Sequence, residues 1–308
     1  MTTGTTTLPA SPHAPGTARA AAWAAAVASV AFGASVVATR YVVPQTTPVG
    51  LAFLRYLVAT TCLLLLLGRR AFPRMTGSDR VRVVLLGVLF FAVFPWSFSA
   101  SLTHLPSAQV ALAVTANPLL TTALSVWRGV ERLTGRAVVG QLLAFAGLAL
   151  ALAPGATAAA TGGQDGAWLG YVEIAITVLC GAVYNVWSRS LLSRHDPVAI
   201  TAQSMLMGTI ALAPLAFAQG LVGRLPGITV AGWATVLFLG TAGGAVGFGL
   251  WIWALRHSTP SRVAVFFALN PVTAIVLGVV LLGEPVSGRL LVAFAAVVGG
   301  IQLVARGR

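Results

Sequence analysis

The chain has 308 residues, of which 57% are hydrophobic and only 8% are charged, and its formal net charge is +13. A soluble domain carries about 25% charged residues, so this composition excludes a soluble globular protein and indicates a multi-pass membrane protein. The 19 basic residues are all arginines, in short clusters between apolar runs instead of on one basic face, and this pattern argues against a nucleic-acid-binding protein.

Residues 1–20 are rich in Thr, Pro, Ala and Gly, and we expect them to form a disordered cytoplasmic tail. Beyond them, apolar segments near the ~20 residues that cross a bilayer recur along the chain. We predict ten membrane spans, at residues 21–43, 49–68, 82–104, 107–127, 137–155, 167–188, 197–219, 229–254, 261–282 and 287–305. The fold class is therefore all-α.

The arginines predict the direction of the spans. With a cytoplasmic N-terminus, 15 arginines fall in inside segments and 3 in outside segments, while Arg55 lies within a span. Cytoplasmic loops carry the excess of basic residues in membrane proteins. We therefore expect both termini to be cytoplasmic, in the cytoplasmic (inner) membrane of a bacterium.

An internal repeat relates the two halves of the chain. Residues 83–147 align with residues 236–300 at a constant offset of 153, without a gap. The aligned pairs are His104 with His257, Asn117-Pro118 with Asn270-Pro271, and Glu131 with Glu284. A duplicated unit with an odd number of spans must lie in opposite orientations in its two copies. We predict two inverted five-helix repeats, over residues 21–155 and 166–305, around a central cavity.

The two Asn-Pro pairs lie in mid-span. Pro118 and Pro271 each remove a backbone hydrogen bond, which is tolerated at membrane depth where the backbone is buried or lines a cavity. They are either hinges beside the cavity or kinks that serve helix packing alone. Asn117 and Asn270 should face inward near the pseudo-two-fold axis, because an amide without partners is costly in hydrocarbon. They either bind substrate, together with Thr121 on the same face as Asn117, or join helices.

Two charged residues lie inside apolar spans at similar depth. Glu173 is roughly 10 Å from the outer end of its span at 1.5 Å per residue, and Arg55 is at nearly the same level. Ionisable residues within spans are typical of transport pathways. Glu173 and Arg55 either form an ion pair at the outer end of the pathway or extend to the interface without a further role. Alternatively, Arg55 binds a substrate carboxylate.

Further candidates for the cavity wall are polar or aromatic. Ser97 and Ser101 share one face of the third span, and Tyr184 follows Glu173 on one stripe of the sixth. For Trp251 and Trp253 we favour an aromatic belt at the membrane interface. Glu131 and Glu284 lie at loop–span junctions, where a local salt bridge or helix cap is the favoured role.

Both halves resemble a known family. The segments "VALAVTANPLLTTALSVWRGVERLTGRAVVGQLLAFAGLAL" and "VAVFFALNPVTAIVLGVVLLGEPVSGRLLVAFAAVVGG" resemble the ends of two units of the EamA family of the drug/metabolite transporter superfamily. "FGASVVATRYV" followed by "LAFLRYLVA" resembles the start of a unit, and Arg55 matches the family pattern. "GEP" at 283–285 fits, whereas "GVER" at 129–132 has Val130 before the glutamate. The resemblance implies a ten-helix transporter with a cavity between its repeats.

We therefore predict an exporter of small metabolites, most of all amino acids or related amphipathic compounds, that works by alternating access. The alternatives within the family are an exchanger and an exporter of drugs or toxic compounds. An intramembrane enzyme acting on lipid is disfavoured, because the spans carry no His/Asp, Ser/His or metal cluster. The expected partners are a small-molecule substrate, the lipid bilayer and a coupling proton, with no nucleic acid, no cofactor and no metal. We expect a monomer.

Overall fold

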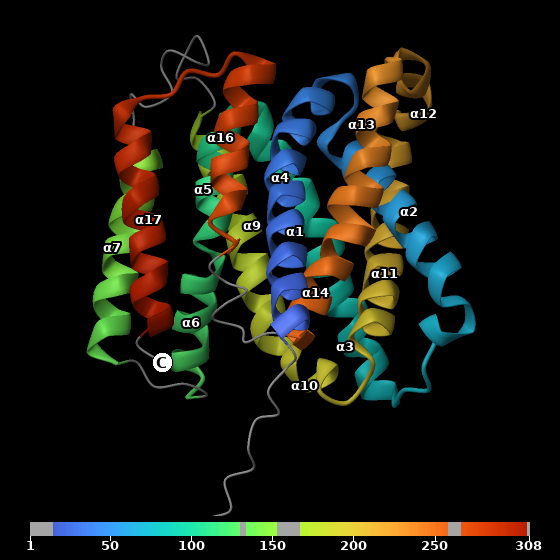
Figure 1. Cartoon of the computed structure of the whole chain (residues 1–308). Coiled ribbons are helices and arrows are strands. Elements are labelled where there is room, and N and C mark those ends of the chain that lie inside the picture. Colours follow the sequence, from blue (N-terminus) through green and yellow to red (C-terminus); the bar gives the residue numbers. More distant parts are fainter. Residues whose placement is uncertain (1–14, 130–133, 153–166, 258–265, 307–308) are drawn as a thin grey trace, which may run out of the picture.

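A computed structural model describes residues 15–129, 134–152, 167–257 and 266–306, and these contain helices and turns but no strand (Figure 1). The main helices of the first half are α1 (Pro15–Val42), α2 (Pro48–Leu67), α3 (Gly77–Val88), α4 (Phe94–His104), α5 (Ser107–Thr115), α6 (Asn117–Trp127) and α7 (Gly135–Leu152). Those of the second half are α9 (Ala167–Trp187), α10 (Arg189–Leu192), α11 (Pro197–Ala218), α12 (Leu221–Arg224), α13 (Val230–Gly240), α14 (Gly247–His257), α16 (Leu269–Leu282) and α17 (Gly288–Arg306).

Each predicted span is mostly helical where the structure describes it. Within the described residues, seven helical segments are long and apolar enough to cross a membrane, and three shorter apolar helices lie at 138–151, 269–282 and 288–303. The polytopic helical fold is therefore confirmed, while the count of ten spans stays a prediction. The expected tail over residues 1–20 needs a correction. The helix α1 already begins at Pro15, because the alanine-rich sequence after Pro15 favours helix; residues 1–14 lie outside the described residues.

Both Asn-Pro pairs lie in the first turn of a helix. The fourth predicted span is divided at Ala116, where α5 ends and α6 begins with Asn117-Pro118. In the second half, α16 begins at Leu269, just before Asn270-Pro271 and directly after a turn. Proline is tolerated in a first turn because the backbone N–H that it lacks would have no partner within the helix there.

The offset of 153 recurs in local structure. Thr76 and Thr229 cap α3 and α13 with the same dihedral angles (φ −66°, ψ 161°), and each side chain accepts a hydrogen bond from the backbone three residues on. The two segments with π-helical turns, Leu89–Val93 and Thr241–Val246, follow at equivalent positions. Equivalent sequences therefore fold alike in the two halves.

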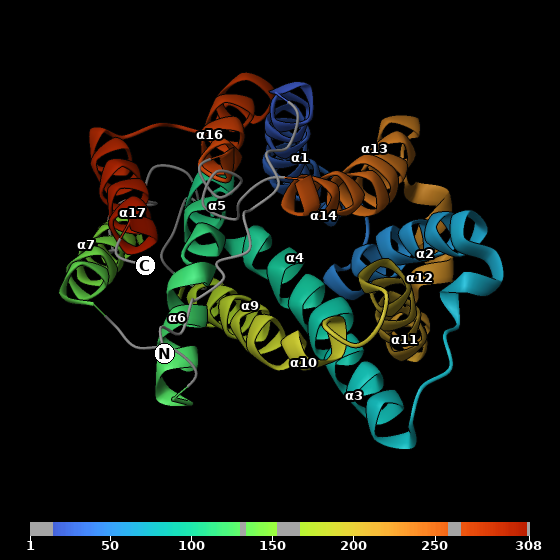
Figure 2. The same ribbon diagram turned by 60° about the horizontal axis from the view of Figure 1, so that its bottom comes forward.

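The helices exchange partners between the halves. The equivalent helices α7 and α17 pack together, as do α2 and α11, while α16 packs on α5, the helix that precedes its counterpart α6. In addition α1 packs on α14 and α16, while α9 packs on α4 and α6 (Figure 2). This is the pattern expected when a two-fold axis relates two units. Interlocked apolar side chains such as Leu51, Leu212 and Leu239 fill the interface around α2, α11 and α13.

Two ends of the bundle can be distinguished in Figure 1. The upper end is where α1 ends and α17 begins, and the lower end is where α1 begins and α17 ends. The described termini thus lie at the same end. The arginine distribution predicts that the lower end is cytoplasmic and that the upper end is outside.

Candidate functional site

Asn117, at the start of α6, connects the two halves of the chain. Its side-chain Nδ2 donates to the carbonyl oxygen of Val178 on α9 (3.0 Å), and its Oδ1 accepts from Asn185 Nδ2 (2.8 Å). Thr121 Oγ1 donates to the Asn117 carbonyl oxygen (2.9 Å) and lies 3.3 Å from Asn185 Nδ2. Asn185 is exposed and was not among the predicted site residues, although it lies one residue after Tyr184.

Glycine lets α9 approach Asn117. A Cβ atom at Gly181 would collide with the Asn117 side-chain nitrogen. A similar contact occurs in the other half, where a Cβ atom at Gly33 on α1 would collide with the carbonyl oxygen of Asn270. The two Asn-Pro pairs therefore pack against the same kind of position on the first helix of the opposite half.

Asn117 and Asn270 nevertheless have different surroundings. Asn270 is 4% exposed, and its buried Oδ1 has no hydrogen-bond partner. Pro271 is buried as well, whereas Pro118 is exposed. A buried amide oxygen without a donor is uncommon in proteins, so Asn270 remains a candidate for contact with a bound molecule.

The stripe on α9 faces the bundle interior. Thr177 is fully buried; its hydroxyl donates to the Glu173 carbonyl oxygen (2.9 Å) and lies 2.8 Å from Ser97 Oγ on α4. Tyr184 is 8% exposed and stacks on Phe90, with ring centroids 4.2 Å apart. Ser101 is fully buried and donates to the carbonyl oxygen of residue 98 within its own helix. Of the predicted residues, Tyr184 lies on this interior face of α9 and Ser97 of α4 contacts it through Thr177. Ser101 does not contact α9 through its hydroxyl, which donates within α4.

Glu173 and Arg55 are not paired among the described residues. The Oε2 atom of Glu173 lies 4.0 Å from His104 Nε2, and that oxygen is buried without a hydrogen-bond partner. Arg55 is 8% exposed, and its guanidinium lies 5.3 Å from the ring centroid of Tyr56. The expected ion pair is therefore wrong for this conformation. Similar depth did not bring the two groups together, because α2 packs against α11 and α13, whereas α9 packs against α4 and α6.

A charged cluster that the sequence did not predict joins the two halves at the upper end. Glu284 accepts three hydrogen bonds from Ser107, two from its backbone N–H (3.1 and 3.0 Å) and one from its hydroxyl (3.0 Å). Arg40 Nε lies 3.4 Å from Glu284 Oε1, and Arg40 Nη1 donates to the carbonyl oxygens of Leu102 and Leu105. We call Arg40, Ser107 and Glu284 the upper clamp. The expected cap at Glu284 thus exists, but its partners are distant in sequence; Glu131 lies outside the described residues.

The dipoles of two helices explain the charges in the upper clamp. Glu284 lies at the N-terminus of α5, where unpaired N–H groups favour an anion. Arg40 lies at the C-terminus of α4, where unpaired carbonyls favour a cation. The clamp thereby ties the second half, through Glu284, to α1 and the α4–α5 connection of the first. Beside it is a hollow of about 400 Å³, lined partly by Tyr41 and Pro285.

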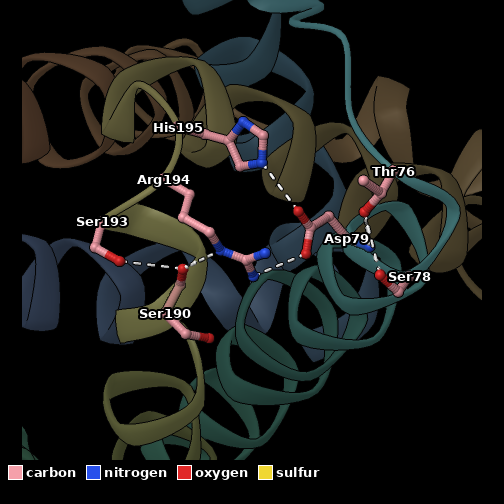
Figure 3. Close-up of polar contacts among 7 residues, drawn as sticks. All are labelled: Thr76, Ser78, Asp79, Ser190, Ser193, Arg194 and His195. Atoms are coloured by element: carbon pink, nitrogen blue, oxygen red, sulfur yellow. Dashed lines mark hydrogen bonds and ion pairs between the residues drawn. The ribbon is translucent and has the colours of Figure 1, made fainter.

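A second charged cluster joins the halves at the lower end (Figure 3). Asp79 on α3 has a side chain only 3% exposed, and it accepts from Arg194 Nη2 (2.9 Å) and lies 3.1 Å from His195 Nε2. Arg194 Nε also donates to the Ser190 carbonyl oxygen (2.8 Å), which fixes its direction. We call Asp79, Arg194 and His195 the lower clamp. None of these three residues was a predicted site residue. Arg194 and His195 are adjacent basic residues after α10, and nothing in the sequence distinguishes them from other basic residues between spans.

The tryptophans divide between the interior and the surface. Trp251 packs edge-on against Phe32 (6.2 Å between centroids) and Phe267 (5.5 Å), so it belongs to an aromatic cluster between α1, α14 and the start of α16. Trp253 is 37% exposed and stacks on His257 at 4.4 Å. The exposure of Trp253 is consistent with the expected place in an aromatic belt at the membrane interface, whereas the ring contacts of Trp251 place it inside the bundle. Within the described residues, no group of three His, Cys, Asp or Glu side chains is placed to hold a metal ion.

Comparison with known proteins gives consistent matches over both halves. A family model described as "EamA-like transporter family" matches residues 19–153 and again residues 168–306. A protein of Archaeoglobus fulgidus named "Uncharacterized transporter" is 27% identical over 290 residues, which cover 93% of this chain and 99% of that protein. A solved crystal structure with 22% sequence identity superimposes with a TM-score of 0.68, covering 94% of this chain and 97% of that one, and supports the fold alone.

Two relatives have names that state a cargo. A "Probable terminal-alkyne amino-acid exporter" of Streptantibioticus cattleyicolor is 28% identical over 287 residues, covering 93% of each protein. A "Probable amino-acid metabolite efflux pump" of Salmonella typhimurium is 24% identical over 287 residues, covering 89% of this chain and 91% of that protein. At these identities the cargo of a relative is a guide to candidates for this chain.

Proposed function

The chain belongs to the EamA-like transporter family, and from this we propose that it exports amino acids or related amphipathic metabolites by alternating access. Membership makes it a multi-pass membrane transporter and not an enzyme, which removes the lipid-acting alternative. Beyond family membership, we propose the cargo and the outward direction of transport. We also propose that the protein is a monomer in the cytoplasmic membrane, with both termini on the cytoplasmic side.

The observation that carries the proposal is the amide contact between Asn117 and Asn185. These side chains connect the two repeats near the end of α9, where Asn185 is exposed and Asn117 is partly buried. An amide offers both donors and acceptors, which suit the carboxylate and ammonium groups of an amino acid. The unpaired Oδ1 of Asn270 is a second acceptor for an ammonium group. Relatives named as amino-acid exporters support the same class of cargo.

The two clamps support alternating access. The upper and lower clamps each join residues of one half to residues of the other, at opposite ends of the bundle. A carrier must hold one end closed while the other opens, and polar contacts between the halves at each end can stabilise such closure. Both clamps are formed in this structure, so opening either end requires one of them to separate. Opening the upper end would separate Glu284 from Ser107 and Arg40, so water or cargo must replace those contacts.

An exporter of apolar drugs or toxic compounds is the second candidate. The aromatic cluster of Phe32, Phe248, Trp251 and Phe267 favours it, because partly buried rings that pack edge-on can open to accept an apolar molecule. A passive exchanger is compatible with the same geometry. These alternatives differ from the first in the cargo and in the energy source, which transport assays separate.

The test is counterflow in proteoliposomes loaded with an unlabelled mixture of the twenty protein amino acids. We expect the wild-type protein to accumulate at least one labelled amino acid from outside. Asn117→Leu should reduce that uptake strongly, because leucine keeps the size but removes both contacts of the amide. Gln219→Leu removes an exposed amide at the end of α11 and serves as the matched control. Absence of counterflow for all twenty by the wild-type protein would contradict the proposed cargo.

A further inference from the structure

The carboxylate of Glu173 is in an unusual setting for a membrane helix. It lies in the second turn of α9 with a side chain 19% exposed, and its Oε2 is buried with no hydrogen-bond partner. The nearest basic group is His104 Nε2 at 4.0 Å, beyond hydrogen-bond distance. A buried carboxylate oxygen is normally satisfied by a donor. Among the described residues, no donor lies within hydrogen-bond distance of this oxygen.

Packing fixes the spacing between Glu173 and His104. A Cβ atom at Gly170 would lie 2.8 Å from His104 Cβ and 2.7 Å from Leu105 Cγ, so α9 meets the end of α4 as closely as the backbone allows. Glu173 is almost one helical turn further along α9 and therefore lies beside the same imidazole. The two titratable groups are held together by a helix contact that a larger residue at position 170 would prevent.

Among the described residues of the helices that pack on α9, no charged group besides His104 lies beside Glu173. The sequences of α5, α6 and the Leu89–Val93 segment contain no ionisable side chain, and α4 contributes only His104. Arg189 of α10 is at the opposite end of α9. Arg40 flanks His104 through the carbonyl oxygens of Leu102 and Leu105, but its charge is matched by Glu284. An acid and an imidazole isolated in this way are suited to exchange one proton.

We propose that Glu173, with His104 as its partner, is the binding site for a proton that the transporter exchanges for its cargo. The proposal rests on the proposed export function. The ionised Glu173 carboxylate takes up one proton on the outer side, where a cargo molecule is released, and becomes a neutral carboxylic acid. It releases that proton on the inner side, where the next cargo molecule binds. No bond other than the O–H bond forms or breaks. Proton relays in transporters are built from such Asp, Glu and His side chains.

The position on α9 links proton and cargo. Gly181, which packs on Asn117, lies eight residues beyond Glu173, roughly 12 Å along the helix at 1.5 Å per residue. Thr177 lies between them, bonded to the Glu173 carbonyl oxygen and to Ser97. Because both sites lie on one rigid helix, a shift of α9 that exposes Glu173 also changes the contacts of Asn117. His104 is a positioning residue that sets where the proton is held.

The first measurement is transport by the full chain in proteoliposomes. With the amino-acid mixture as probe, an imposed gradient of one pH unit should drive roughly tenfold accumulation, the limit for a one-for-one exchange. Glu173→Gln, which imitates the neutral acid, should lose this accumulation and keep counterflow without a pH gradient. Asp196→Asn, which retains a side-chain oxygen to cap α11, is the matched control and should behave as wild type.

The second measurement needs no cargo. Infrared difference spectra between acidic and alkaline pH should contain a carboxylic-acid C=O band that is absent from Glu173→Gln and present in Asp196→Asn; the chain has only six acidic side chains, which makes the assignment practicable. His104→Gln should shift the pH at which this band disappears, since the two groups share the proton.

The outcomes are distinguishable. If the wild-type protein shows no counterflow, the proposed cargo is wrong, and the infrared band still decides whether Glu173 binds a proton. If counterflow occurs but a pH gradient drives no accumulation, the proton proposal is wrong while the export function stands. A spectrum unchanged by Glu173→Gln would refute the site directly. Loss of counterflow in Glu173→Gln would also overturn the proposal, because it would make Glu173 a contact of the cargo.

Discussion

Replacing Glu284 by glutamine tests whether the upper clamp holds the two halves together. Both carboxylate oxygens accept from the Ser107 backbone N–H, and one of them also accepts from the Ser107 hydroxyl and lies 3.4 Å from Arg40. Glutamine has nearly the same shape but only one accepting oxygen. Its NH₂ group would face the donors of Ser107, and the charge opposite Arg40 would be lost.

The cost follows from the number of contacts and their burial. The side chain of Glu284 is 10% exposed and that of Arg40 is 23% exposed, so solvent screens the pair only in part. A hydrogen bond to a charged group contributes about 1.5–3 kcal/mol, and the loss of one partner of a buried pair costs about 3–5 kcal/mol. Because Ser107 keeps one acceptor and Arg40 keeps two carbonyl partners, we expect Glu284→Gln to lower the free energy of unfolding by about 2–3 kcal/mol.

The assay is reversible unfolding in mixed detergent micelles, as a double-mutant cycle with Arg40→Gln. The double variant should be about 1 kcal/mol more stable than the sum of the single effects predicts, since the second substitution removes a group whose partner is already missing. Additive effects within error would refute the coupling. A Glu284→Gln variant as stable as wild type would show that the clamp contributes nothing measurable to folding.

Three further results are expected. Gly181→Ala should reduce both stability and transport, because its Cβ would meet the side-chain nitrogen of Asn117, whereas Gly249→Ala, with open space around it, should be neutral in the same assays. Gly33→Ala should lower the free energy of unfolding more than Gly181→Ala, within about 1–3 kcal/mol, because the backbone oxygen of Asn270 cannot rotate away; equal effects would contradict this. A reporter fused to the C-terminus should be active only in its cytoplasmic form, and periplasmic activity there would overturn the orientation.

Patterns along the chain were sufficient to predict most of the helices and the repeat, but not the break at Ala116 or the start of α1 at Pro15. The offset of 153 predicted that the two Asn-Pro segments would behave alike, and both lie at the start of a helix that follows a break. The reason is local: proline removes a backbone donor wherever it occurs, so the structural result does not depend on distant partners. The matching caps at Thr76 and Thr229 have the same local origin.

The partners of charged residues could not be predicted in this way. Glu284 and Arg40 are 244 residues apart, and Asp79 meets Arg194 across 115 residues. Sequence patterns give the depth of a residue in a span and the face it occupies, but not which helix lies opposite. That is why the depth argument paired Glu173 with Arg55, whereas the packing of α9 on α4 placed His104 beside it.

The unequal surroundings of the two asparagines follow from the helices opposite them. If Gly33 on α1 is taken as the counterpart of Gly181 on α9, the counterpart of Asn185 is Val37, which is 2% exposed and has no side-chain donor. Asn117 Oδ1 therefore has a protein partner in Asn185, while Asn270 Oδ1 has none. The difference between Asn185 and Val37 therefore accounts for a bonded amide oxygen in the first Asn-Pro pair and an unbonded one in the second. Under the proposed function, the ammonium group of an amino acid supplies the missing donor, so the asymmetry of the repeat is itself a basis for selecting cargo.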